Sequence, residues 1–378
     1  MQVVDTPAFQ RLRYIRQLGH AFLVYPGATH TRFEHALGTY QLAKRSLRRF
    51  DVSTLERTFI ELGALLHDVG HYPFSHALEE SGLASHETVG QSLLATGELA
   101  EVLAGAGFDD PAAAFGAVIR GASDHPLAGL ISGSIDLDKI DYLRRDALHC
   151  GVPYGEVDVD RLIACLVPVE LDGRRTVGII EKGIAALESL LFAKYQMYRN
   201  VYWHHAVRAA TAMFKRLVHE AVVDRALDVG TLAEANDDWL MHDLLETDRT
   251  GLALALRSRR LYKRALEVSP AELKVAPPAW LRGDPKRLAK AEDALAKLAG
   301  LGPAELLIDF PYKQSMLGLD IPIVLKSGEV QRLTQEGWPG RMDLPPFAGN
   351  LAESACRLRV FTRRPARIPM EMLEETLR

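Results

Sequence analysis

The chain has 378 residues, 48% of them apolar and 25% charged, which is ordinary for a globular protein of about two domains. Its formal net charge of −4 argues against a general nucleic-acid coat protein. The charge leaves room for a small anion in a local basic pocket, and nucleic acid stays open as a partner.

Two capping boxes predict the first long helices. Thr31–Glu34 opens a helix that carries His35, and Ser53–Glu56 opens a second. After the second box, apolar residues recur every three or four positions, as in an amphipathic helix. We expect that helix to carry His67 and Asp68 on its last turn, before a glycine and a proline end it.

A third helix is predicted from about 134 to 149. On it Asp138, Tyr142 and Asp146 are spaced i, i+4 and i+8, so all three project from one face. A longer helical region spans about 183–227, and the first two-thirds of the chain is expected to be helical.

The pattern changes towards the C-terminus. Prolines and a glycine interrupt the segment from 270 to 284, which predicts a linker. Short strand-like runs follow at 306–310, 321–325 and 357–361. We therefore expect a mainly α protein with a helical core at 1–265, a linker and helix at 266–300, and a smaller α+β lobe at 301–378.

The stretch from Leu66 to His76 holds the densest set of polar side chains, including the adjacent pair His67 and Asp68. A buried carboxylate needs a partner, and clustered imidazole and carboxylate groups commonly bind a metal ion. Together with His35 and Asp138 they form a possible four-ligand set. This set suits one divalent ion of Mn, Fe, Zn, Ni or Co, with Mg possible, and leaves positions for water and substrate.

These ligands have alternative interpretations. A lone histidine on a helix, such as His35, is more often a hydrogen-bonded core or surface residue than a ligand. Asp138 could be a surface acid, because Asp136 and Asp141 lie close to it. Its alignment with Tyr142 and Asp146 on one helical face favours the functional interpretation.

A second histidine group consists of His71, His76 and His86, with Glu87 next to His86. In a structural interpretation, His71 caps a helix end and His76 lies on a solvated helix. In a functional one, an imidazole that titrates near neutral pH protonates a leaving oxygen or contacts phosphate. Glu87 could then orient or charge the ring of His86.

Cations and aromatic residues near these groups suggest an anionic ligand. Arg32 lies at a helix N-terminus, where a cation is not favoured, and this position hints at a phosphate partner. Lys139 and Lys194 are weaker candidates of the same kind. Tyr142 and Tyr202 could pack against a sugar or base, although aromatic residues at helical spacing are more often core.

Four segments in this order resemble the HD-domain deoxynucleoside triphosphate (dNTP) triphosphohydrolases: Phe9–Gly19, Tyr25–His35, His67–His76 and Asp136–Tyr142. The resemblance is strong over about residues 5–205. It implies a helical HD-domain core with a C-terminal mixed lobe. It also implies hydrolysis between the 5′ oxygen and the α-phosphorus, which releases the nucleoside and inorganic triphosphate.

The same resemblance implies roles for individual residues. The metal ligands would be His35, His67, Asp68 and Asp138. His76 would be the general acid, with His71 and His86 near the phosphates. The remaining implied contacts are Gln17 and Leu18 at the deoxyribose, Asp146 and Tyr142 at the sugar hydroxyls, and Arg32 and Lys139 at the phosphates.

Two departures from the family pattern concern regulation and base choice. Relatives usually carry a segment reading Asp-Pro-(Val/Ile)-His-Gly before Phe9, and its absence here puts activation by a nucleotide in doubt. Trp203 stands where the best-known relative has glutamine near the base, so base preference does not transfer.

Three functions follow as hypotheses. The first is dNTP triphosphohydrolysis by a homo-oligomer, a dimer or tetramer, with a possible nucleotide activator. The second is another HD-type phosphohydrolase, a nucleoside monophosphatase or a phosphodiesterase with a second metal. The third is a nucleotide-sensing protein with little turnover. No run of about 18 apolar residues predicts a membrane span, no signal peptide is evident, and the three scattered cysteines are typical of a cytoplasmic protein.

Overall fold

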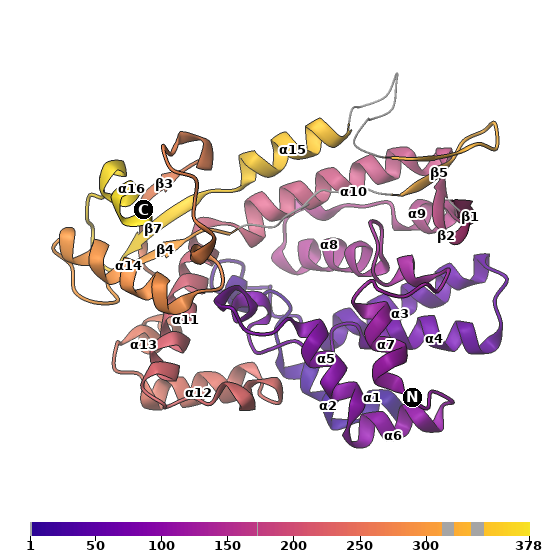
Figure 1. The fold of residues 1–378 in the computed structure, drawn as a ribbon, viewed down its shortest axis with the longest axis horizontal. Helices are drawn as coiled ribbons and strands as arrows, with labels where there is room; N and C mark the ends of the chain where they lie inside the picture. The colour runs from indigo at the N-terminus through magenta and orange to yellow at the C-terminus, as the bar shows by residue number, and fades with distance from the viewer. Residues whose placement is uncertain (1, 172, 312–320, 334–343) are drawn as a thin grey trace.

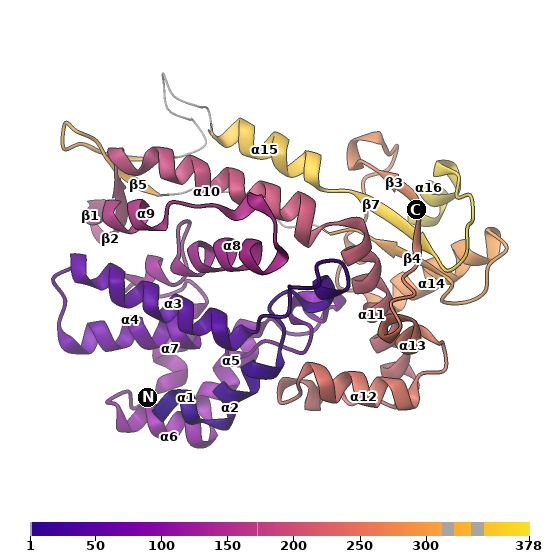
Figure 2. The same ribbon diagram turned by 180° about the vertical axis from the view of Figure 1, so that it is seen from behind.

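The computed structural model describes residues 2–171, 173–311, 321–333 and 344–378. Most of them are helical, and the two ends of the described chain lie at opposite ends of the molecule (Figures 1 and 2). The mainly α fold with a smaller C-terminal sheet region is therefore confirmed.

The N-terminal part is a body of packed helices, in which α3 contacts both α4 and α8. The helices of this part are α1 (Gln2–Asp5), α2 (Pro7–Gln10), α3 (Arg32–Ser46), α4 (Thr54–Leu66), α5 (His86–Ala95), α6 (Gly97–Gly105), α7 (Pro111–Ile119) and α8 (Leu137–Cys150).

Both predicted capping boxes are present. The side chain of Glu34 accepts the backbone N–H of Thr31, and the side chain of Glu56 accepts that of Ser53. The predicted end of the second helix was wrong by one turn, because α4 ends at Leu66. His67 occupies the C-cap position of α4, and Asp68 lies in the turn that follows the helix.

The long helical region predicted at 183–227 consists of α10 (Ile184–Met197), a π-helical turn η9 (Tyr198–Tyr202) and α11 (His205–Val223). A π-turn widens the helix locally and is frequent at functional sites. The other helices are α9 (Val159–Cys165), α12 (Asp237–Thr247), α13 (Leu252–Arg257), α14 (Pro285–Leu298), α15 (Leu344–Ala355) and α16 (Met370–Leu377).

Two small sheets complete the fold. The first has the order β1-β2-β5-β6 and the second β3-β7-β4. In the first, β1 and β2 form an antiparallel hairpin, and β2 pairs in parallel with β5 through Ile179 and Ile323. Their bounds are β1 (Leu166–Leu171), β2 (Arg174–Ile180), β3 (Lys263–Val268), β4 (Leu306–Asp309), β5 (Pro322–Val324), β6 (Val330–Arg332) and β7 (Leu358–Thr362).

The three predicted strand runs correspond to β4, β5 and β7. The hairpin of β1 and β2 lies in a region that was expected to be helical, and that expectation was wrong there. The predicted division at 265/266 falls inside β3, which pairs with β7 near the C-terminus. The two parts of the chain therefore share a sheet.

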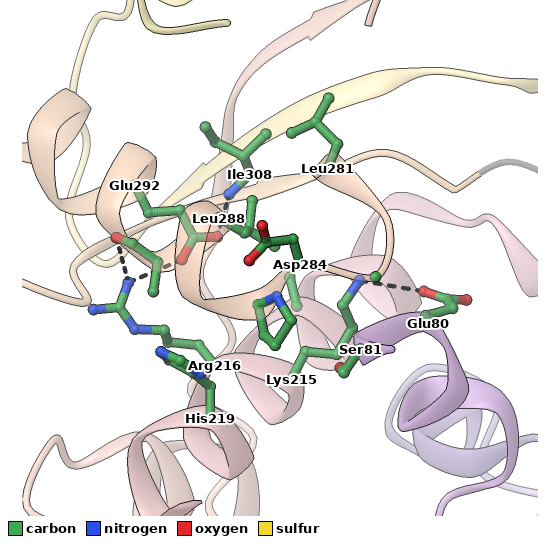
Figure 3. A pocket seen from close by; sticks show the side chains of 14 residues that line it. Glu80, Ser81, Lys215, Arg216, His219, Leu281, Asp284, Leu288, Glu292 and Ile308 are labelled. Atoms are coloured by element: carbon green, nitrogen blue, oxygen red, sulfur yellow. Dashed lines mark hydrogen bonds and ion pairs between the residues drawn. The ribbon is translucent and has the colours of Figure 1, made fainter. Parts of the chain in front are cut away.

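One hydrophobic cluster runs through both parts of the molecule and includes Phe9, Leu66, Leu187, Ile308 and Leu373. A separate small cavity of about 20 Å³, enough for about one water, lies where α11, α14 and the turn η5 (Glu79–Ser81) meet (Figure 3). The second part of the chain is thus packed directly against the segment that follows the His-Asp motif.

Candidate active site

A cavity of about 580 Å³ lies between the 17–21 loop, the 67–87 segment, α8 and the junction of α10 with α11. Its volume is that of a small-molecule site. His35 is fully buried behind its wall. The predicted site residues that line the cavity are Gln17, Leu18, Arg32, His67, Asp68, His71, His76, His86, Glu87, Asp138, Tyr142, Asp146 and Tyr202.

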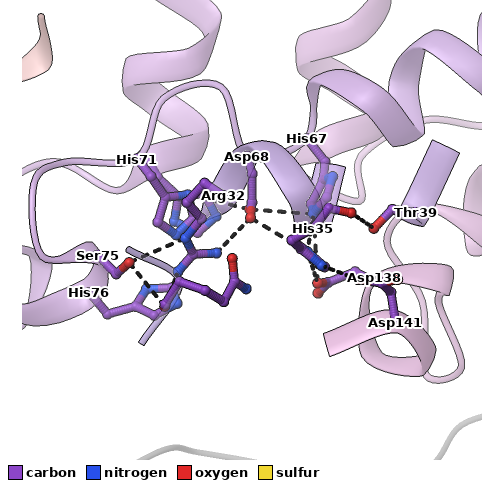
Figure 4. Close-up of polar contacts among 12 residues, drawn as sticks. Arg32, His35, Thr39, His67, Asp68, His71, Ser75, His76, Asp138 and Asp141 are labelled. Atoms are coloured by element: carbon purple, nitrogen blue, oxygen red, sulfur yellow. Dashed lines mark hydrogen bonds and ion pairs between the residues drawn. The ribbon is translucent and has the colours of Figure 1, made fainter. Parts of the chain in front are cut away.

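Three of the predicted metal ligands, His35, His67 and Asp138, bring their ligand atoms together at one side of this cavity, and Asp68 lies beside them (Figure 4). The Nε2 atom of His35 lies 3.2 Å from Nε2 of His67 and 3.0 Å from Oδ1 of Asp138. Asp68 approaches with both oxygens, Oδ2 at 3.6 Å from Nε2 of His35 and Oδ1 at 3.4 Å from Nε2 of His67. Metal–ligand bonds of about 2.1 Å place neighbouring ligands about 3 to 3.5 Å apart, so this donor set fits one divalent ion.

The far nitrogens of both imidazoles are fixed by other groups. Nδ1 of His35 lies 2.8 Å from Oδ2 of Asp141, and Nδ1 of His67 lies 2.9 Å from the carbonyl oxygen of Ala64. Asp141 is held in turn by two hydrogen bonds from Arg145. Such outer contacts select the tautomer in which Nε2 is the free ligand atom.

The charges of the group favour a bound cation. Burial by itself lowers the pKa of His35, but hydrogen bonds to Asp138 and Asp141 outweigh it and raise the pKa to about 10. Burial by itself raises the pKa of Asp138, but hydrogen bonds from His35 and His67 hold it well below its usual range. The carboxylates therefore stay ionised and require positive charge at the Nε2 atoms, from protons or from a metal.

Arg32 does not point freely into the cavity. Its NH1 donates to Oδ2 of Asp68 at 2.6 Å, and its Nε donates to Oγ of Ser75 at 3.2 Å (Figure 4). Both Arg32 and Asp68 are buried. The guanidinium thus neutralises the acid of the His-Asp motif and ties it to the turn that precedes His76.

The second histidine group is also assembled. The side chains of His71, His76, Glu79 and His86 present ligand or hydrogen-bonding atoms within 4.8 Å of one another. Oε1 of Glu79 accepts from Nδ1 of His86 at 3.0 Å and lies 3.4 Å from Nδ1 of His76. The side chain of His76 is 56% exposed, whereas His71 is fully buried.

Glu79 controls the charge of this group. Burial by itself lowers the pKa of His86, but the hydrogen bond to Glu79 outweighs it and raises the pKa. Glu87 lies 3.5 Å from Nε2 of His86 and adds to this effect. The pKa of His71 is well below its usual range because of burial and the nearby Arg32. The group therefore pairs a histidine whose surroundings favour the neutral form, His71, with one whose surroundings favour the cationic form, His86.

Asp146 also lines the cavity and is already held by two groups. Its Oδ1 lies 2.8 Å from Nε2 of His30, and its Oδ2 accepts from the hydroxyl of Tyr202 at 2.7 Å. Tyr142 and Tyr202 approach each other edge to face. A carboxylate fixed in this way can accept a hydrogen bond from a ligand hydroxyl.

The structure places neither predicted lysine in the cavity wall. The ammonium group of Lys139 binds Asp136, and it donates to the carbonyl oxygen of Gly133 at 2.9 Å. Lys194 is a buried residue of α10. For Lys139, local contacts thus take the place that was predicted for a phosphate.

Three residues that position the site were not singled out from the sequence: His30, Glu79 and Asp141. A signal existed for two of them, because Glu79 follows His76 by three residues and Asp141 follows Asp138 by three, which is the spacing of neighbours on a helical turn. His30 offered none, because its partner Asp146 lies 116 residues away.

Comparisons with known protein families give two matches. The family described as "HD domain" matches residues 32–146, and "HD associated region" matches residues 157–337. These ranges contain the four predicted metal ligands, the second histidine group and most of the cavity wall. No helix among the described residues is long and apolar enough to cross a bilayer.

Several curated proteins are similar in sequence. An uncharacterised protein of Methanocaldococcus jannaschii is 38% identical over 72% of this chain and 57% of its own length. One of Bacillus subtilis is 35% identical over 58% of this chain and 51% of its own. Deoxynucleoside triphosphate triphosphohydrolase SAMHD1 of Gallus gallus is 29% identical over 54% of this chain and 40% of its own length. This chain therefore spans only about half of the length of these curated relatives.

Two solved structures share the fold. A hypothetical protein from Aquifex aeolicus superimposes with a TM-score of 0.73 at 27% identity, over 100% of this chain and 94% of the other. A phosphohydrolase from Bacteroides thetaiotaomicron gives a TM-score of 0.70 at 22% identity, over 96% of this chain and 95% of the other. The likeness therefore extends over the whole chain, including the C-terminal sheet.

Proposed function

The chain belongs to the HD-domain phosphohydrolase family, and on this basis we propose that it hydrolyses dNTPs to deoxynucleoside and inorganic triphosphate. The observation that carries the proposal is that one cavity holds three elements of such a site. These are the metal-ligand group around His35, the group of His76 and Glu79, and the fixed carboxylate of Asp146. The name of the SAMHD1 relatives supports the choice of substrate.

His35, His67, Asp68 and Asp138 would hold one divalent ion. An ion bound there supplies Lewis acidity and lowers the pKa of a water molecule, as hydrolysis at neutral pH requires. The protein's own part is to keep both Nε2 atoms directed at that position, through Asp141 and the Ala64 carbonyl.

His76 would protonate the departing 5′ oxygen. Its ring is the most exposed of the second group, and Glu79 contacts it at Nδ1, which leaves Nε2 to face the substrate. The pKa of Glu79 stays well below its usual range, because hydrogen bonds from His76 and His86 outweigh the effect of burial. An ionised Glu79 orients the ring of His76 for this role.

Phosphate charge would be balanced mainly by imidazolium and the bound cation. Both arginines of the described cavity wall are already paired, Arg32 with Asp68 and Arg208 with Glu80. His86 is a better partner for phosphate, because its raised pKa keeps it cationic to higher pH. On the sugar side, Asp146 and Tyr202 would bind the 3′ hydroxyl.

The test is incubation of metal-free protein with each dNTP and each ribonucleoside triphosphate, after addition of Mn, Mg, Fe or Co in turn. Products are separated by ion-exchange chromatography and identified by phosphorus NMR. Inorganic triphosphate from dNTPs is the expected product. Release of orthophosphate or pyrophosphate, or no release with any nucleotide, would reject the proposal.

A second candidate is a phosphohydrolase with two metals, as in a phosphodiesterase or a nucleoside monophosphatase. The observation in its favour is the group of His71, His76, Glu79 and His86, whose atoms lie close enough to share an ion. Metal analysis of the saturated protein distinguishes the two. A count near one per chain supports the first proposal, and a count near two supports this one.

Assembly and regulation remain predictions. The resemblance implies a dimer or tetramer and a possible nucleotide activator. Light scattering with and without each dNTP measures both the mass of the assembly and any change on nucleotide binding.

A further inference from the structure

The turn that leads into His76 has an unfavourable backbone. Phe74 and Ser75 are consecutive non-glycine residues in the left-handed region, with φ of 56° and 57°. Such conformations are uncommon for residues with a side chain and cost about 1 kcal/mol or more each. They persist only where surrounding contacts hold them, so the contacts of this turn show what fixes the position of His76.

Asp237 provides one of these contacts. Its Oδ1 accepts the backbone N–H of Phe74 at 2.7 Å. Its Oδ2 accepts the backbone N–H of Arg16 at 3.1 Å and the Arg16 guanidinium at 3.3 Å. Asp237 is the first residue of α12 and only 1% exposed, although it comes more than 160 residues after the turn.

The two segments that Asp237 joins are neighbouring parts of the cavity wall. Arg16 precedes Gln17 and Leu18, which line the cavity. Phe74 precedes Ser75, whose hydroxyl donates to the carbonyl oxygen of Arg16 at 2.7 Å. Asp237 and the Ser75 hydroxyl therefore together hold the loop expected at the sugar against the turn that leads into His76.

The residues just before Asp237 are also linked, through Arg11, to the segment that carries the predicted metal ligands His67 and Asp68. The guanidinium of Arg11 donates to the carbonyl oxygen of Ala235 at 2.9 Å and to that of Val69 at 2.8 Å. Val69 follows Asp68 directly. The start of α12 is thus tied to both halves of the site while contributing no residue to the described cavity wall.

We propose that Asp237 is a positioning residue for His76, which it acts on through the strained turn at Phe74 and Ser75. The proposal rests on the proposed function only where it concerns turnover. The contact itself can be tested without a substrate.

The test compares Asp237→Asn with Asp238→Asn, an exposed neighbour on the same helix that gives the same change in charge. Asparagine keeps one acceptor but turns an NH2 group towards either Phe74 or Arg16, so one N–H loses its partner. We expect kcat of the Asp237 variant to fall about 10- to 100-fold, with metal content unchanged. Asp238→Asn should match the wild type.

A double-mutant cycle separates positioning from a general structural defect. If Asp237 acts through His76, Asp237→Asn should cause little further loss in a His76→Ala background, because the residue that it positions is already gone. Losses that multiply would overturn the proposal, as would an unchanged kcat in Asp237→Asn.

Hydrogen–deuterium exchange of the peptide that contains Phe74 gives a readout independent of activity. We expect the Phe74 amide to exchange at least about 10-fold faster in Asp237→Asn, while Asp238→Asn leaves it protected. If the wild type hydrolyses no nucleotide, the proposed function fails, but the exchange measurement still tests whether Asp237 holds the turn at Phe74. Equal protection in both variants would overturn the contact itself.

Discussion

Nδ1 of His35 lies 2.8 Å from Oδ2 of Asp141, so the buried imidazole is fixed at the nitrogen that faces away from His67 and Asp138. In Asp141→Asn the side chain can present its amide group to the ring and favour the wrong tautomer. We expect metal affinity to fall about 10- to 100-fold, measured by competition with a chelator. Asp109→Asn, an exposed acid, is the control and should bind metal as the wild type does.

Gly38 on α3 provides an independent test of the same contact. A Cβ atom at this position would lie 2.1 Å from Oδ1 of Asp141 and 2.2 Å from NH2 of Arg145. Gly38→Ala should therefore displace the pair and weaken metal binding, although alanine favours a helix more than glycine does. Gly105→Ala, which enters open space, is the matched control. Equal metal affinity in both variants would contradict this account.

Local sequence patterns predicted much of the fold and several residues of the cavity wall. The boxes at Thr31 and Ser53 located α3 and α4, because capping involves residues only three apart. The spacing of Asp138, Tyr142 and Asp146 correctly placed all three on one face, and all three line the cavity. These features depend on neighbours within one or two helical turns.

Features that depend on distant partners were not predictable. The strand β2 is completed by β5, which lies more than 140 residues later. Lys139 was predicted at a phosphate, but the N-cap residue Asp136 takes its charge locally. Asp237 gave no signal, since its partners Phe74 and Arg16 come from remote segments.

His76→Ala separates chemistry from metal binding. If His76 is the general acid, its removal should slow dNTP hydrolysis about 10²- to 10⁴-fold while the metal stays bound. Because His76 is not one of the four predicted metal ligands, elemental analysis should find as many metal ions per chain in the variant as in the wild type. Hydrolysis at the wild-type rate would show that another group donates the proton.

Asp138→Asn should remove metal and activity together. The amide is a poor ligand for a transition metal, and it leaves His35 and His67 without the carboxylate that both contact. We expect less than about one tenth of the wild-type metal content after dialysis, measured by elemental analysis. A variant that keeps its metal but loses activity would instead assign Asp138 to the substrate.

Stability should depend on pH through Glu292, at the boundary of the small cavity in Figure 3. Arg216 is shared by Glu220, Glu292 and Asp293, so one guanidinium faces three carboxyl groups. Burial raises the pKa of Glu292 from 4.5 to about 7, and the attraction of Arg216 only partly offsets this. Glu292 is the most buried of the three acids and is therefore the one that retains a proton.

The sign of the effect follows from this raised pKa. Between about pH 4.5 and 7 the folded protein binds one more proton at Glu292 than the unfolded chain does. The free energy of unfolding should therefore fall as pH rises through this range, by about 3 kcal/mol at most from this group. Glu292→Gln cannot ionise and should flatten that part of the curve, measured as urea midpoints at several pH values. Glu371→Gln, at an exposed site on α16, should keep the wild-type slope, and an unchanged slope in Glu292→Gln would show that Glu292 is ionised throughout.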